Sequence, residues 1–332
     1  MIKLPMIAVF ELTYQCNHRC LFCSCPWENE KQYKKKELSK EEWFDVIDIL
    51  SNNGVTHVTL SGGEPLLRSD LKEIIRYLNK KGITINLISN GKIMSDEMLA
   101  LIHELNISLS ISVPGLDTFK DHTGIDNIEN VLEIFTKAKQ LGIKTTANIA
   151  VTKKNLPELY QNIALPLLLG ADYILLNRFL PGGRGMANKE YLLTNGEINE
   201  MLNIAEEVLV QANRYGHVGT ELPYCIIENP EKYKHLSVSS KCAAAKKFFV
   251  VDPSGYIKVC NHSPHKLVLY KEIEKLKNNL YWFNYINSNF IPDMCKSCIH
   301  LDICDGGCRE AANVNYGNIN DIDPCFEKSK LG

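Results

Sequence analysis

Three closely spaced cysteines, Cys16, Cys20 and Cys23, constrain the fold of this chain more than any other feature. Their spacing, C-x3-C-x2-C, closes a tight loop that can present three thiolates to one inorganic centre. A 4Fe–4S cluster normally takes four thiolates, so a loop with three leaves one iron open to another ligand. Zinc is the alternative, but a structural zinc site needs four ligands, and His18 inside the loop would crowd them. The spacing therefore favours an iron–sulfur site with one open position.

This loop resembles the cluster loop of the radical S-adenosylmethionine (radical SAM) family, and Phe22 matches the aromatic residue usual before the third cysteine. In that family the open iron chelates the amino and carboxylate groups of S-adenosylmethionine (SAM). The resemblance implies an enzyme that receives one electron from a flavodoxin- or ferredoxin-like donor and cleaves SAM. The resulting 5′-deoxyadenosyl radical would remove hydrogen from an unactivated carbon.

The composition of the chain limits the classes of partner and the cellular compartment that we expect. The 332 residues carry a formal net charge of −2, which gives no reason to expect nucleic acid or an anionic membrane as a partner. The longest apolar stretch, residues 163–176, is too short and too interrupted to span a bilayer. With no export signal at the N-terminus, we expect a cytoplasmic protein. Twelve cysteines in that setting favour metal binding over disulfides.

Residues 7–215 alternate between strand-like and helix-like segments, which predicts a parallel α/β sheet. We expect strands at 7–13, 55–60, 83–88, 107–112, 143–151 and 173–179. We expect helices at 38–51, 69–81, 95–105, 127–141, 156–169 and 196–215. Ser39 and Glu42 form a capping-box pattern at the first of these helices. Six β/α repeats match the open, partial (β/α)6 barrel of radical SAM enzymes and not a closed eightfold barrel.

The predicted domain organisation has three parts. Residues 1–215 are expected to form the partial barrel, and residues 216–241 a bridging segment. Residues 242–332 hold seven of the twelve cysteines and show little helix-period hydrophobicity. We expect them to form a small domain folded around its metal cofactors.

The turn Ser61-Gly62-Gly63-Glu64-Pro65 follows the second predicted strand. Ligand sites of parallel α/β sheets lie beyond the carboxyl ends of the strands, and glycines let the backbone approach a ligand closely. The turn matches the GGE motif of the radical SAM family, in which it holds the methionine amino group of SAM. A plain strand-to-helix turn is the alternative.

Later strand ends carry further polar side chains. The family resemblance implies that Ser89, Ser112 and Asn148 contact the ribose or the methionine carboxylate of SAM, whereas each serine by itself is as well explained as a strand-end cap. Pro114 departs from the acidic or polar residue often found there in the family. Arg178 could pair with the SAM carboxylate through its guanidinium fork, or form an ordinary surface ion pair.

The cysteines of the C-terminal part follow the pattern Cys242-x12-Gly255-x4-Cys260, Cys295-x2-Cys298-x5-Cys304-x3-Cys308, then Cys325. This pattern resembles the SPASM domain, an iron–sulfur domain of radical SAM enzymes that mature peptides and proteins. Zinc knuckles are the alternative, although one four-cysteine zinc site would leave three cysteines over.

The SPASM resemblance implies two auxiliary 4Fe–4S clusters. One would be held by Cys295, Cys298, Cys304 and Cys325, and the other by Cys242, Cys260 and Cys308. Because the second set is one ligand short, its site is open, or is filled by Cys225 or by a substrate sulfur. Cys225 could instead donate a hydrogen atom to a substrate radical. A buried inert thiol is the ordinary expectation both for it and for Cys25.

The resemblance to SPASM enzymes implies a peptide-modifying enzyme of the kind that matures ribosomally made peptides (RiPPs). Its product would contain a cross-link, a thioether or an epimerised residue. The chain starts at the first barrel strand, so we expect a separate leader-peptide-binding protein, a short leader, or direct docking of the substrate. The alternatives are a small-molecule or cofactor-biosynthesis radical SAM dehydrogenase, a sulfatase-maturase-like protein oxidase, and a non-catalytic electron-transfer protein.

Overall fold

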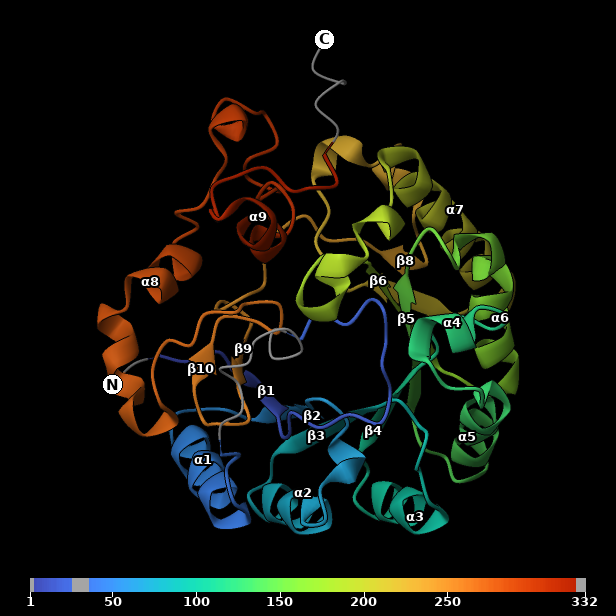
Figure 1. Cartoon of the computed structure of the whole chain (residues 1–332), viewed down its shortest axis with the longest axis vertical. Coiled ribbons are helices and arrows are strands. Elements are labelled where there is room, and N and C mark those ends of the chain that lie inside the picture. Colours follow the sequence, from blue (N-terminus) through green and yellow to red (C-terminus); the bar gives the residue numbers. More distant parts are fainter. Residues whose placement is uncertain (1–2, 26–35, 327–332) are drawn as a thin grey trace.

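The computed structural model describes residues 3–25 and 36–326. One ten-stranded sheet organises these residues, in the order β10-β9-β1-β2-β3-β4-β5-β6-β7-β8. Figure 1 shows the sheet curving around a central space, with helices α1, α2, α3, α5, α6 and α7 on its outer side and β9 and β10 next to β1. The helices cover one face of the sheet, so the other face is left to line the interior.

The six expected β/α repeats are confirmed, with ends that differ by a few residues. The strands are β1 (Ile7–Glu11), β2 (His57–Ser61), β3 (Thr84–Ser89), β4 (Ser108–Ser112), β5 (Thr145–Val151) and β6 (Tyr173–Arg178), each parallel to the next. The helices are α1 (Lys40–Asn52), α2 (Leu71–Lys80), α3 (Asp96–Glu104), α5 (Ile128–Gln140), α6 (Leu159–Leu169) and α7 (Asn195–Ala212). A short helix, α4 (Phe119–Thr123), lies between β4 and α5. The expected partial (β/α)6 barrel is therefore present.

Local sequence signals explain these elements. The capping box at α1 forms as expected, since the Ser39 hydroxyl accepts from the Glu42 N–H and the Glu42 carboxylate accepts from the Ser39 N–H. Burial alternates along β5, with Ala147 and Ile149 buried and Asn148 half-buried. The buried residues pack under the helices, and the half-buried ones face the interior.

The sheet continues beyond the six repeats on both sides, which the sequence analysis did not anticipate. The expected helix 196–215 ends early, because Asn213 adopts a left-handed conformation (φ 48°) that terminates α7. The segment expected as a bridge contributes β7 (Tyr215–Val218) and β8 (Leu236–Ser237). The cysteine-rich part contributes β9 (Phe248–Val251), parallel to β1, and β10 (Ile257–Lys258).

The C-terminal part is therefore joined to the barrel through the sheet. It also contains α8 (Leu280–Ile286) and α9 (Arg309–Tyr316). A buried ion pair reinforces the joint, because Nζ of Lys258 lies 3.0 Å from Oε2 of Glu11 at the end of β1. Burial raises the pKa of Glu11, and the Lys258 ammonium opposes that shift. No helix in the described residues has the length and apolar character needed to cross a membrane.

Candidate functional site

A cavity of about 640 Å³ lies at the carboxyl ends of the barrel strands. It gathers most of the side chains that the sequence singled out. The predicted site residues on its wall are Cys16, Cys20, Cys23, Gly62, Gly63, Glu64, Ser89, Ser112, Asn148, Arg178, Cys242, Cys260 and Cys308. Other cysteines of the described residues lie outside this lining, namely Cys225, Cys295, Cys298, Cys304 and Cys325. One space is thus shared by the first cysteine loop, the GGE turn and part of the C-terminal cysteine set.

The GGE turn holds the backbone that leads into the cysteine loop. The Gly63 N–H donates to the Thr13 carbonyl at 2.7 Å, and the Glu64 N–H donates to the Gln15 carbonyl at 2.8 Å. A Cβ on Gly63 would stand 2.0 Å from the Gln15 carbonyl oxygen, and Gly62 has a φ of +137°. Only glycine fits this close approach, so the two glycines are needed for the shape of the site itself.

A second side of the cysteine loop rests on α4. The Arg19 N–H donates to the Thr123 carbonyl and the Leu21 N–H to the His122 carbonyl, each at 2.9 Å. His122 is fully buried, and its Nε2 lies 2.9 Å from the Thr152 hydroxyl after β5. The loop between the cysteines is therefore fixed to the barrel through its backbone.

The glycine-rich loop after β6 supports the third side. Arg184 Nη1 donates to the Cys20 carbonyl at 3.0 Å. Gly183 has a φ of +47°, and a Cβ there would stand 2.2 Å from the Cys25 carbonyl oxygen. This loop is not a phosphate loop in sequence, and in the structure it serves to hold the cysteine loop in place.

The three thiols of this loop all lie on the wall of the cavity. Burial raises the pKa of Cys20, and the neighbouring thiols of Cys23 and Cys16 raise it further. Among the described residues, no group of three or more His, Cys, Asp or Glu side chains is arranged to hold a metal ion. Coordination to iron would keep a buried thiol such as Cys20 ionised.

The buried Glu64 carboxylate accepts several hydrogen bonds from the residues around the turn. It accepts from the Leu66 N–H at 3.1 Å, from the Ser89 hydroxyl at 2.9 Å and from the Asn90 N–H at 2.8 Å. Burial raises its pKa to about 7, although these hydrogen bonds pull in the other direction. Asn90 in turn places its Nδ2 3.9 Å from the Cys16 sulfur. Both Glu64 oxygens and the Ser89 hydroxyl therefore have partners within the protein, and their contact with SAM stays a prediction.

The remaining strand-end residues face the cavity from the next strands. Asn148 Oδ1 accepts from Asn177 Nδ2 at 2.9 Å, so β5 and β6 present a linked pair of amides. Ser112 and Pro114 also lie on the wall. Asn177 was not predicted as a site residue from the sequence. Its polar side chain near the end of a strand is the same feature by which Ser89, Ser112 and Asn148 were predicted.

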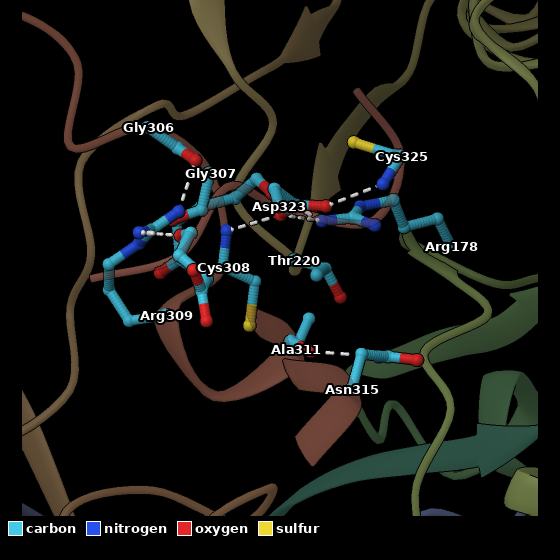
Figure 2. A network of polar contacts seen from close by, with 12 residues as sticks. Arg178, Thr220, Gly306, Gly307, Cys308, Arg309, Ala311, Asn315, Asp323 and Cys325 are labelled. Atoms are coloured by element: carbon cyan, nitrogen blue, oxygen red, sulfur yellow. Dashed lines mark hydrogen bonds and ion pairs between the residues drawn. The ribbon is translucent and has the colours of Figure 1, made fainter. Parts of the chain in front are cut away.

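Arg178 has a protein partner that the sequence analysis did not identify. Its Nη2 forms an ion pair with Asp323 and donates to the Glu221 carbonyl at 3.1 Å (Figure 2). Both charged side chains are buried, with 2% and 0% of their surface exposed. The expected alternative of a surface ion pair was therefore wrong, because the pair is buried, and a SAM contact would have to share this guanidinium.

Two buried aspartates accept hydrogen bonds from the backbone of C-terminal cysteines, and neither was predicted from the sequence. Asp323 accepts from the Cys325 N–H two residues on, at 2.9 Å. Asp305 accepts from the Cys242 N–H at 2.9 Å. The order Asp-Pro-Cys is a signal that would have identified Asp323, because aspartate often bonds the backbone two residues ahead.

Cys225 was one of the candidates for the vacant position beside Cys242, and it is absent from the cavity lining that includes Cys242. Its side chain is exposed, so the expectation of a buried thiol was wrong. The preceding residue, Tyr224, donates its N–H to the Cys304 sulfur at 3.4 Å. Partial burial raises the pKa of Cys225, and the Cys304 and Cys295 thiols raise it further. Cys225 therefore lies near Cys304 and Cys295, and its role as a cluster ligand or hydrogen donor stays a prediction.

Comparison with known proteins finds a family model that matches the barrel part and relatives that match nearly the whole chain. The model of the radical SAM superfamily matches residues 10–162. A PqqA peptide cyclase of Bradyrhizobium diazoefficiens is 26% identical over 99% of this chain and 87% of that protein. The PqqA peptide cyclase of Rhodopseudomonas palustris is 27% identical over 99% of this chain and 88% of that protein.

Solved structures match over nearly the whole chain. Streptococcus suis SuiB bound to its precursor peptide SuiA aligns with a TM-score of 0.76 at 15% identity, covering 97% of this chain and 75% of that one. Native anSMEcpe with bound AdoMet and Cp18Cys peptide aligns with a TM-score of 0.73 at 16% identity, covering 97% of this chain and 94% of that one. At such identities the likeness establishes the fold, including the cysteine-rich part.

Proposed function

We propose that this chain, whose residues 10–162 match the model of the radical SAM superfamily, is a peptide-modifying enzyme that presents one residue of its substrate in the barrel cavity. The observation that carries the proposal is the shared cavity. It brings the three-cysteine loop, the GGE turn and the inner C-terminal thiols of Cys242, Cys260 and Cys308 to one wall. The relatives named PqqA peptide cyclase support a peptide as the substrate.

The residues present fit the two cofactors of this family. Cys16, Cys20 and Cys23 would hold a 4Fe–4S cluster, and SAM would lie against the GGE turn and the polar strand ends. Together these groups supply a 5′-deoxyadenosyl radical when bound. The chain's own part is to hold the thiols around one space, to bring the backbone of Gly62 and Gly63 close to the ligand and to keep water out.

We propose that the reaction is an oxidative cross-link. After one hydrogen atom has been removed from the substrate carbon, closing a new bond releases one proton and one electron. The electron needs an acceptor of the iron–sulfur class. The buried thiols of Cys242, Cys260 and Cys308 on the cavity wall would place such an acceptor next to the substrate. A flavodoxin- or ferredoxin-like donor and a separate leader-binding protein complete the proposal, as does a cytoplasmic location.

The test is anaerobic incubation of the iron-reconstituted protein with SAM, a reductant and a candidate substrate peptide. We expect about twelve irons per chain from three clusters. We also expect formation of 5′-deoxyadenosine and a peptide product that has lost two hydrogens. Bound zinc without iron-based absorbance would refute the cofactor assignment, and 5′-deoxyadenosine without any peptide change would refute the substrate class.

Epimerisation is the competing outcome, and Cys225 separates it from cross-linking. An epimerised peptide keeps its mass in water and gains one deuteron in heavy water. If Cys225 were the hydrogen donor, Cys225→Ala would keep its iron and cleave SAM but leave the product unfinished. Because Cys225 lies near Cys304 and outside the cavity lining, we expect the variant to alter the iron signal instead.

A further inference from the structure

One buried carboxylate, that of Asp323, gathers contacts from separate parts of the site. Its Oδ2 accepts from Arg178 and from the Cys308 N–H, the latter at 2.6 Å, while its Oδ1 accepts from the Cys325 N–H at 2.9 Å. Figure 2 shows Asp323 between these three residues, with the two sulfur atoms pointing in different directions. Asp323 thus touches the barrel and two cysteine-bearing segments at once.

The segment around this carboxylate leaves it little freedom. Gly307 has a φ of +87°, and a Cβ there would stand 2.4 Å from Asp323 Oδ2. The fully buried Arg309 donates to the Gly306 carbonyl and, through Nη1, to the Asp321 carbonyl at 2.8 Å. Arg309 therefore ties the loop before Cys308 to the segment that leads into Asp323.

Through Arg178, the Arg178–Asp323 pair is also connected to the segment that carries Cys242. Arg178 donates to the Glu221 carbonyl at 3.1 Å, and the Glu221 carboxylate accepts from the Ala243 N–H at 3.0 Å, next to Cys242. The guanidinium at the end of β6 therefore stands among the backbones that carry Cys242, Cys308 and Cys325. An arginine suits this place because its planar fork serves several acceptors at once.

We propose that the Arg178–Asp323 pair is the positioning element that sets Cys308 and Cys325 together, and so aligns both auxiliary iron–sulfur sites with the end of β6. The inference rests on the proposed function, in which Cys308 and Cys325 belong to different clusters. In that arrangement the carboxylate lies between the two sites. Its charge and its two backbone hydrogen bonds act on both, since net charge and hydrogen bonding set the potential of such clusters.

Asp252 provides a matched control. It is also buried, it is paired with Lys266 at 2.6 Å, and its Oδ1 accepts from the Ser254 and Tyr256 N–H groups. Asp252 thus has the same chemistry as Asp323, but these backbone hydrogen bonds come from residues that are not cysteines. A change at Asp252 should leave both iron signals at their parental potentials, whereas the same change at Asp323 should shift both.

The experiment uses the full chain with Cys16, Cys20 and Cys23 replaced by Ala, so that the remaining iron signals come from the C-terminal thiols. Redox titration followed by electron paramagnetic resonance compares Asp323→Asn with Asp252→Asn. We expect Asp323→Asn to shift both auxiliary signals to higher potential, because a buried negative charge is lost. Asp252→Asn should shift neither signal. A shift of one signal or of none in Asp323→Asn overturns the inference.

A second variant covers failure of Asp323→Asn to take up iron, which an unpaired buried Arg178 could cause. The double variant Arg178→Gln, Asp323→Asn removes both charges and keeps polar side chains at both places. Two shifted signals in it support the inference, and two parental signals overturn it. If the parent chain takes up no iron at its C-terminal thiols, the proposed function fails first, and this inference fails with it.

Discussion

The barrel and the cysteine-rich part of this protein are stabilised in different ways. Under the barrel helices the fully buried side chains are mostly apolar, such as Trp43, Ile47 and Phe135. The C-terminal part shares this apolar core through residues such as Phe249 and Trp282, but its buried groups also include Asp305, Asp323 and several thiols. Apolar burial is non-directional and needs no cofactor, whereas buried charges and thiols need specific partners. The barrel should therefore fold on its own, and the cysteine-rich part should depend on what its thiols bind.

The largest expected effect comes from removing the first cysteine loop's thiols. Replacing Cys16, Cys20 and Cys23 with Ala should abolish SAM cleavage and remove about four irons. The unfolding midpoint of the barrel should stay within a few degrees of the parent, because the loop is held by its backbone. Iron analysis, 5′-deoxyadenosine assay and thermal unfolding check this. A barrel that unfolds in this variant would break the comparison between the two regions.

Removal of all metal should separate the two regions most directly. Hydrogen exchange of the metal-free protein should become faster across residues 242–326 and stay slow in β2 to β5, because folding of cysteine-rich parts is coupled to their metals. Reconstitution with iron and sulfide should restore the protection. Equal protection of both regions without metal would show that the C-terminal part does not need its cofactors to fold.

A single methyl group at Gly63 should damage the barrel side of the site. Because a Cβ there would stand 2.0 Å from the Gln15 carbonyl oxygen, Gly63→Ala should cost about 1–3 kcal/mol in stability and weaken SAM binding at least about tenfold. Gly196→Ala is the control, since a Cβ at that position meets nothing within 4 Å. Equal SAM affinity in the two variants would contradict the close approach of the turn.

The last expected effect concerns the pH dependence of barrel stability. Burial raises the pKa of Glu64 from its usual 4.5 to about 7, so between these values the folded chain keeps a proton that the unfolded chain has released. The contribution of Glu64 is therefore greatest below pH 4.5 and falls as the pH rises through 7, by on the order of 3 kcal/mol.

Glu64→Gln should remove this slope, which urea unfolding of the metal-free protein at pH 5 and pH 8 can measure. The variant should lose less stability than the parent between these two pH values. Identical losses would show that Glu64 does not titrate in this range.

Several features of the fold follow from local sequence alone. The six β/α repeats, the capping box of Ser39 and Glu42 and the place of the GGE turn depend on neighbouring residues, so periodicity and spacing were enough to predict them. The predictions failed where strands are short or paired over long distances. β8 and β10 have two residues each, and β9 pairs with β1 far away in the chain.

The sequence by itself determined which residue types stand at the barrel's strand ends and how the cysteines are spaced. The tertiary structure decided their partners. Arg178 meets Asp323 across 145 positions of the chain, and Cys225 meets the neighbourhood of Cys304 and not that of Cys242. The physical reason is that buried charges and thiols take whatever partner the packed fold brings near. That proximity depends on the strands and loops together, and no local pattern records it.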